Sequence, residues 1–190
     1  SGTTGHPKGV MIDHKSLVTT YLGWELKYGL KDITNHLQMA GSSFDVFSGD
    51  FVRALLSGGK LILCSKQVLL RPEKLHQLIV DEHVEIAEFV PAVLNNLVDY
   101  LEDNRIKLDG IKLLISGSDC LLKKDYLRIR NICSSGARII NSYGLTETVI
   151  DSLYFEQTAL DFLNESLPIG CPLPDTAVYV LDNQLRPLPV

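Results

Sequence analysis

Short apolar runs alternate with longer stretches of helical periodicity along the 190 residues of this chain. The runs at 60–64, 86–89, 113–115 and 137–140 have the length of buried strands, and prolines stand where two of the intervening helices begin. This alternation is typical of βαβ units, and it predicts an α/β fold of layered, mostly parallel sheets with flanking helices. The segment 177–181, bounded by prolines, predicts a strand at the start of a small separate β element.

Composition excludes several classes of function. A hydrophobic content of 45% and a charged content of 22% are ordinary for a soluble globular domain. The formal net charge of −5 argues against a nucleic-acid partner, because such proteins concentrate Lys and Arg. No apolar run is long enough to span a bilayer, so we expect no membrane partner and a cytoplasmic location. Neither the cysteines nor the histidines stand at the spacing of metal ligands.

The first nine residues, Ser-Gly-Thr-Thr-Gly-His-Pro-Lys-Gly, combine glycines, hydroxyl side chains and one cation. Glycines let backbone N–H groups converge on an anion, the hydroxyls add donors, and the Lys8 ammonium offsets negative charge. The combination favours a polyphosphate ligand, and a solvated turn is the alternative interpretation. It is not a Walker A loop, because Pro7 and Gly9 stand where that pattern requires a glycine and a hydroxyl.

Three further segments follow this opening: SFDVFSGDFVRALLSGGKLIL from residue 43, NSYGLTE from residue 141 and LPIGCPLPDTAVYVLDNQLRPLPV from residue 167. Together the four segments resemble the adenylation domains of non-ribosomal peptide synthetases, which belong to the superfamily of adenylate-forming enzymes. The resemblance implies ATP-dependent activation of an amino acid as its aminoacyl-adenylate, with release of pyrophosphate and loading onto a phosphopantetheine carrier. It also implies carrier and condensation domains of the same assembly line as partners.

The resemblance covers the whole chain and implies that it is an internal fragment. Residues 1–165 would be the central α/β part of the large adenylation subdomains, and residues 166–190 would begin the following β subdomain. The ribose-binding aspartate and the catalytic lysine of the family would lie beyond Val190, so we expect the isolated fragment to be inactive.

The resemblance assigns two segments to ATP and Mg²⁺. In the opening loop, the residues expected to hold the β- and γ-phosphates are Ser1, Gly2, Thr3, Thr4, Gly5 and Lys8. In the second segment, Tyr143 would stack on adenine, the Asn141 amide would bond its edge, Thr146 would donate to the α-phosphate, and Glu147 would hold Mg²⁺. The catalytic group would be Lys8, Thr146 and Glu147, and further nucleotide contacts would come from Gly117, Ser118, Ser142 and Gly144.

The sequence Phe44-Asp45-Val46-Phe47 matches the Phe-Asp-x-Ser motif of the family except at Phe47. In amino-acid-activating members this aspartate pairs with the α-ammonium of the substrate, so Asp45 favours an amino acid. Two of the other pocket positions, Glu88 and Asp151, are acids. Because a buried carboxylate without a cation is costly, we predict a substrate with a positively charged side chain, ornithine or lysine. Local alignment gives the other positions as Val46, Gly49, Glu88, Leu114, Ser116, Ser142, Ile150 and Asp151. A solvent-facing position for Glu88 is the alternative.

Two other functions remain open on the sequence. An acyl- or aryl-CoA ligase shares the chemistry but has no substrate ammonium, so Asp45 is the residue that distinguishes it. A non-catalytic α/β nucleotide-binding module would bind ATP without any carboxylic acid stimulating pyrophosphate exchange.

Overall fold

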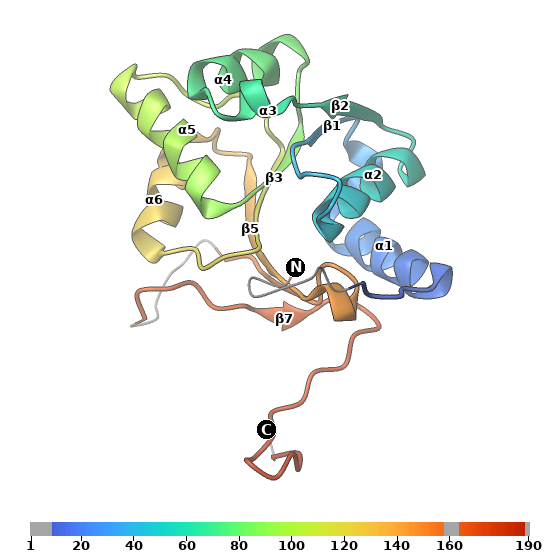
Figure 1. The fold of residues 1–190 in the computed structure, drawn as a ribbon. Coiled ribbons are helices and arrows are strands. Elements are labelled where there is room, and N and C mark those ends of the chain that lie inside the picture. Colours follow the sequence, from blue (N-terminus) through green and yellow to red (C-terminus); the bar gives the residue numbers. More distant parts are fainter. Residues whose placement is uncertain (1–8, 158–163, 189–190) are drawn as a thin grey trace.

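A sheet of seven strands lies at the centre of the computed structural model, which describes residues 9–157 and 164–188 (Figure 1). The strands lie in the order β2-β1-β3-β4-β5-β6-β7; the first five run parallel, and β6 and β7 are antiparallel additions. The predicted α/β class with a mostly parallel sheet is confirmed. The strands are β1 (Asn35–Gln38), β2 (Lys60–Leu63), β3 (Ile86–Phe89), β4 (Leu113–Ser116), β5 (Arg138–Tyr143), β6 (Leu153–Phe155) and β7 (Cys171–Pro172).

The helices begin and end where local chemistry dictates. Asp13 caps the first helix by accepting from the Ser16 N–H at 2.7 Å, and Gly29 ends it with a left-handed φ of 72°. Pro72 and Pro91 each occupy the first turn of a helix, as their fixed φ favours. No helix within the described ranges is long and apolar enough to cross a membrane. The α-helices are α1 (His14–Tyr28), α2 (Asp45–Leu56), α3 (Lys66–Leu69), α4 (Pro72–Asp81), α5 (Pro91–Asp103) and α6 (Lys123–Ile132), with 3₁₀ helices η1 (Leu30–Asp32) and η2 (Thr146–Thr148).

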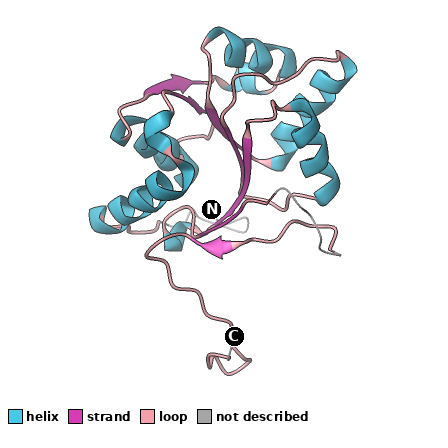
Figure 2. Cartoon of the chain, turned by 180° about the vertical axis from the view of Figure 1, so that it is seen from behind, coloured by secondary structure: helices cyan, strands magenta, loops and turns pink. Residues whose placement is uncertain are grey.

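Helices cover both faces of the sheet and enclose two separate cores (Figure 2). On one face, α4, α5 and α6 pack on alternate strand residues such as Ala87 and Leu114. On the other face, α1 and α2 pack on their neighbours, including Ile115 and Ile140. Because successive strand residues point to opposite faces, a shift of one residue moves a side chain from one core to the other.

The structure departs from the predicted elements in three places. Strand β1 was not expected, nor was the edge formed by β6 and β7, and all three strands are held by pairing with neighbours in the sheet. The strand predicted at 177–181 does not form; its one pairing is the isolated bridge between Leu181 and Pro187. Residues 175–188 extend away from the sheet, which leaves that segment without a pairing edge (Figure 1).

Candidate active site

The predicted site residues gather at the carboxyl ends of the parallel strands. Gly117 follows β4, and β5 ends with Ser142 and Tyr143. Ser116 pairs in register with Asn141, so the residues that follow them stand side by side. The carboxyl edge of an open α/β sheet is where such folds bind ligands.

The described residues that follow the opening loop line a cavity at this edge of the sheet. Ser1, Gly2, Thr3, Thr4, Gly5 and Lys8 lie outside the described residues. Val10 and Ile12, which follow that loop, line a cavity of about 300 Å³. Asp45 at the start of α2, Thr146 in η2 and Ile150 line the same cavity. The structure therefore brings the end of the glycine-rich segment, the Phe-Asp motif and the Thr146 turn to one place.

A second cavity of about 440 Å³ shares Asp45 with the first. The predicted site residues Val46, Glu88 and Ser118 also line this cavity. Apolar side chains such as Val93 line the rest of it. Asp45 stands in the first turn of α2, where its Oδ1 accepts from the Val46 N–H at 2.8 Å. One carboxylate thus faces both cavities.

Gly117, Ser142 and Glu88 lie in close contact across three strands. A Cβ placed on Gly117 would overlap the Ser142 hydroxyl oxygen and lie 3.2 Å from Oε1 of Glu88. Only glycine leaves the space in which the serine hydroxyl and the glutamate oxygen sit. The solvent-facing alternative for Glu88 is wrong, because its side chain is only 4% exposed.

Gly49 and Ile150 also meet, as the pocket alignment expected. A Cβ on Gly49 would lie 3.4 Å from Ile150 and 3.5 Å from the Trp24 ring. Gly49 leaves no open room for a long substrate at this point, because the chain's own Ile150 and Trp24 side chains already fill that space. Trp24 is fully buried, and the sequence analysis did not include it.

Leu114 and Ser116, two residues assigned to the substrate pocket, line neither of the two cavities that contain Asp45. Leu114 pairs with Ala87 and is buried in the core beneath α4, α5 and α6. Ser116, two residues on, shares that face. Ile115 pairs with Glu88 and lies on the face of α1 and α2. Ile115 and Gly117 thus occupy the positions beside Glu88, and the roles of Leu114 and Ser116 in the substrate pocket stay predictions.

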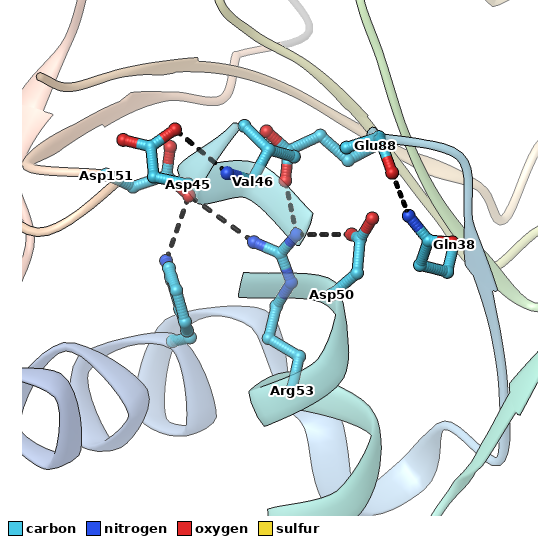
Figure 3. A network of polar contacts seen from close by, with 9 residues as sticks. Gln38, Asp45, Val46, Asp50, Arg53, Glu88 and Asp151 are labelled. Atoms are coloured by element: carbon cyan, nitrogen blue, oxygen red, sulfur yellow. Dashed lines mark hydrogen bonds and ion pairs between the residues drawn. The ribbon is translucent and has the colours of Figure 1, made fainter. Parts of the chain in front are cut away.

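Arg53 is the site residue that the sequence analysis missed (Figure 3). From α2, its Nη2 contacts Asp50 Oδ1 at 2.8 Å and Oε2 of Glu88, and its Nη1 lies 3.4 Å from Asp151 Oδ2. All four side chains are at most 5% exposed. The i, i+3 spacing from Asp50 on the buried face of α2 was the one signal in the sequence for this arginine.

Trp24 fixes the orientation of this cluster. Its ring lies under the Arg53 guanidinium, 4.7 Å from the ring centroid, and its indole N–H donates to Asp151 Oδ2 at 3.1 Å. A stacked cation and a shared carboxylate hold guanidinium and aspartate in one geometry. The tryptophan belongs to α1, so α1, α2 and β3 each contribute side chains to the cluster.

The electrostatic premise for a basic substrate changes with this finding. The sequence analysis treated Glu88 and Asp151 as lacking a cation, and that premise is wrong because Arg53 contacts both. Three carboxylates nevertheless face one guanidinium, so two negative charges are left when all are ionised. Burial, and the repulsion from Glu88, raise the pKa of Asp50 and of Asp151 to about 7 against the pull of Arg53. The cluster therefore contains more carboxyl groups than cations.

The nucleotide-binding heptapeptide is a strand end followed by a tight turn. Tyr143 is 42% exposed at the end of β5, and Thr146 and Glu147 begin η2. The Thr148 hydroxyl accepts from the Leu145 N–H at 3.1 Å and donates to the Leu145 carbonyl oxygen, which closes the turn. These two hydrogen bonds therefore hold the turn together.

The side-chain amide of Asn141 uses its nitrogen, and not its oxygen, in a hydrogen bond among the described residues. Its Nδ2 donates to the Pro168 carbonyl oxygen at 2.9 Å, which ties β5 to the segment before β7. Its Oδ1 is buried without a partner among the described residues. A buried acceptor without a partner is costly, and here it leaves an oxygen free for a ligand donor.

Gly144 is expected to tolerate no side chain. A Cβ there would overlap the Ile150 carbonyl oxygen, because the chain returns from η2 directly against the end of β5. Gly144→Ala in the full-length protein should therefore lower the free energy of unfolding by about 2–3 kcal/mol. Hydrogen exchange of peptides covering β5 and β6 measures the loss. Gly136→Ala is the control, since nothing lies within 4 Å of a Cβ there, and an equal loss in both variants would contradict the close approach.

Comparison with known proteins identifies the family of this chain. The model of the AMP-binding enzyme family matches residues 1–190. Bacitracin synthase 2 of Bacillus licheniformis is 41% identical over 193 residues, and tyrocidine synthase 3 of Brevibacillus parabrevis is 40% identical over 192. Each match covers 100% of this chain but 7% and 3% of the relative, so the chain spans less than a tenth of either.

Solved structures show the same fold. The non-ribosomal peptide synthetase FmoA3 superposes with a TM-score of 0.86 at 27% identity, over 97% of this chain and 20% of that one. The adenylation domain AlmE of Vibrio cholerae, at 21% identity and a TM-score of 0.82 over 98% of this chain and 34% of that one, agrees in fold. The chain belongs to the AMP-binding enzyme family, and its relatives are the adenylation domains of non-ribosomal peptide synthetases.

Proposed function

We propose that this chain supplies the nucleotide and amino-acid pockets of an enzyme that activates an amino acid as its aminoacyl-adenylate. The observation that carries the proposal is the position of Asp45, which lines both cavities. One cavity leads to Thr146 and the segment after the opening loop, and the other leads to Glu88. A substrate held by its α-ammonium at Asp45 would have its carboxylate near the first cavity and its side chain in the second.

The reaction joins one carboxylate oxygen of the amino acid to the α-phosphorus of ATP. The bond between that phosphorus and the oxygen bridging to the β-phosphate breaks, and pyrophosphate leaves. The protein has to position the two reactants and to stabilise the charge on the leaving group. We assign the second task to Lys8 and the opening loop, and the contact with the α-phosphate to Thr146.

The adenosine end of ATP fits the carboxyl edge of β4 and β5. The half-exposed Tyr143 ring offers a stacking face, and the buried Oδ1 of Asn141 can accept from the amino group of adenine. The backbone at Gly117 and Ser118 would lie against the ring, with Ser142 and Gly144 completing that wall. FmoA3 has been solved bound to AMPPNP, a nucleotide of the same kind.

Mg²⁺ fits this site through Glu147 and phosphate oxygens. Among the described residues, no group of three or more His, Cys, Asp and Glu side chains could hold a metal ion. The carboxylate of Glu147 stands alone in η2, and Mg²⁺ favours one or two carboxylates completed by substrate phosphates and water. When bound, the ion would neutralise charge on the phosphates.

The substrate we propose is a basic amino acid, ornithine or lysine. Asp45 would pair with the α-ammonium, and Glu88 with the side-chain ammonium at the other end of the 440 Å³ cavity. The excess of carboxylates over Arg53 in the adjoining cluster makes that end attractive to a cation. The product would then pass to the phosphopantetheine thiol of a carrier domain, with a condensation domain of the same assembly line acting next.

A substrate panel tests the proposal. ATP–pyrophosphate exchange by the full-length protein should be strongest with ornithine or lysine and negligible with fatty or aryl acids. A preference for apolar or acidic amino acids would overturn the substrate, and exchange driven by fatty acids would indicate an acyl-CoA ligase. ATP binding without exchange for any carboxylic acid would leave only a nucleotide-binding module.

Lys8→Ala should slow pyrophosphate exchange about a hundredfold, because the ammonium would no longer offset charge on the departing phosphates. The measurement is the exchange rate of the full-length protein at saturating amino acid. Lys31→Ala is the matched control, since that ammonium is exposed on η1 and pairs with Glu25 at 3.7 Å. Unchanged exchange in Lys8→Ala would show that the opening loop does not hold the triphosphate.

A further inference from the structure

Asp45, Gly49 and Arg53 follow one another at intervals of four along α2, so they lie on one face of the helix. Asp45 and Arg53 are about 12 Å apart along the helix axis, at about 1.5 Å per residue. Helical side chains lean toward the N-terminus, which directs the long arginine back toward Asp45. The helix therefore presents an anion, Asp45, that lines the proposed amino-acid pocket, and a cation, Arg53, farther along the same face.

The guanidinium of Arg53 organises three carboxylates that come from different parts of the chain. Nη2 forms ion pairs with Asp50 of the same helix and with Glu88 of β3. Nη1 forms an ion pair with Asp151, which lies in the segment before β6. Trp24 stacks on the guanidinium and also bonds Asp151. A planar fork can hold several carboxylates at fixed angles, which the single ammonium of a lysine cannot do.

Glu88 alone among these carboxylates lines the 440 Å³ cavity. Its Oε2 contacts Arg53, and its Oε1 lies on the side of Gly117, 3.2 Å from where a Cβ of that residue would stand. The two oxygens thus serve different partners. Arg53 holds the carboxylate in place through Oε2, and Oε1 lies on the side of Gly117.

We propose that Arg53 is a positioning residue that sets substrate specificity: by holding Oε2 of Glu88 it aims Oε1 at the side-chain ammonium of a basic amino acid. The inference rests on the proposed function, in which Glu88 faces the substrate side chain. Arg53 does not cancel the attraction for a second cation, because Asp50 and Asp151 share its charge.

Arg53→Lys in the full-length protein tests this role. Ornithine and norvaline have side chains of the same carbon length and differ in the terminal ammonium, as do lysine and norleucine. The ratio of kcat/KM for ornithine over norvaline, or for lysine over norleucine, should fall about tenfold or more, as expected when a hydrogen bond between charged groups is misaligned. Because loosened packing lowers both members of a pair together, the ratio separates specificity from general damage.

Arg138→Lys is the matched control. This arginine also holds a carboxylate, with Nε and Nη2 each 2.7 Å from Glu156, and it bonds two backbone carbonyl oxygens. It lines neither of the two cavities that contain Asp45. Its replacement by lysine should change the ratio less than twofold, and a tenfold fall there would overturn the specific role of Arg53.

If Arg53→Lys fails to fold, a double variant that removes one charge of each sign tests the proposal instead. Arg53→Gln/Glu88→Gln removes one charge of each sign, and it is compared with Glu88→Gln alone. If Arg53 acts through Glu88, the two variants should have the same substrate ratio within about twofold, because the carboxylate that Arg53 would aim is absent from both. A further fall in the double variant would show that Arg53 acts independently of Glu88 and would overturn the proposal.

The wild-type panel separates this inference from the proposed function. A wild-type protein that shows no preference for basic amino acids removes the proposed substrate, and the role of Arg53 falls with it. A wild-type preference that survives Arg53→Lys within twofold leaves the proposed function intact and overturns the role of Arg53 alone. A wild-type preference that falls in Arg53→Lys and not in Arg138→Lys supports both.

Discussion

Arg53→Met should lower the free energy of unfolding around the cluster by about 3–5 kcal/mol at pH 8, because it leaves three buried carboxylates without a cation. Hydrogen exchange of peptides from α2 and β3 in the full-length protein measures the loss. Arg128→Met is the control: this arginine also bonds two carboxylates, Asp99 and Glu102, but at the surface. Its loss should cost less than about 1 kcal/mol.

The cost of Arg53→Met should depend on pH. Burial first of all raises the pKa of Asp50 and Asp151 from 3.8 to about 7 in the folded protein, so the folded form holds more protons than the unfolded chain between these values. Their contribution to stability is complete below about pH 4 and is lost as the pH rises through about 7. Removing Arg53 raises both pKa values further, so the variant should lose less at pH 5 than at pH 8.

His36 acts in the opposite sense over the same range. Burial lowers its pKa to about 4, so its contribution is present above pH 6.5 and is lost as the pH falls toward 4. The prediction is therefore a difference between variant and wild type at each pH, in which the histidine contribution largely cancels. A loss at pH 5 equal to that at pH 8 would contradict an uncompensated charge as its cause.

Asp45→Asn should lower kcat/KM for the amino acid about 100-fold to 1000-fold, since the α-ammonium would lose its counter-charge in a pocket shielded from water. Asparagine keeps the side-chain oxygen that accepts from the Val46 N–H, so the start of α2 should remain intact. ATP–pyrophosphate exchange by the full-length protein is the measurement. Asp32→Asn, in η1, is the control and should leave kcat/KM unchanged within twofold.

A substrate analogue isolates the role of the ammonium. If the wild type prefers ornithine, 5-aminopentanoate is the same molecule without the α-amino group. The wild type should favour ornithine strongly over this analogue, and Asp45→Asn should treat the two nearly alike. Full retention of the ornithine preference in the variant would assign the α-ammonium to another residue.

Much of the fold was predictable because its elements are locally encoded. The short, mostly apolar segments of β3 and β4 have the length and composition of buried strands. Pro72 and Pro91 mark the starts of two helices, because the fixed φ of proline suits the first turn. Strand β1 was missed because its Asn-His-Leu-Gln sequence carries no apolar pattern. It becomes a strand because β2 and β3 pair with it on both sides.

The site was predictable in its motifs and not in its geometry. Asp45, Thr146 and Ile150 share a cavity because each follows or begins an element at the carboxyl edge of the sheet. The face of each strand residue was harder to predict, because side chains alternate residue by residue and a shift of one position moves a side chain from one core to the other.

The amino-acid sequence by itself determined the parallel α/β architecture, the family and the edge of the sheet where the site lies, because these depend on periodicity and on residues close together in the chain. Only the tertiary structure decided the charge balance of the pocket. Arg53 reaches Glu88 and Asp151 across 35 and 98 positions, and no local pattern records which buried acids one guanidinium will hold. Burial sets the energy of such a cluster, and burial is a property of the folded chain.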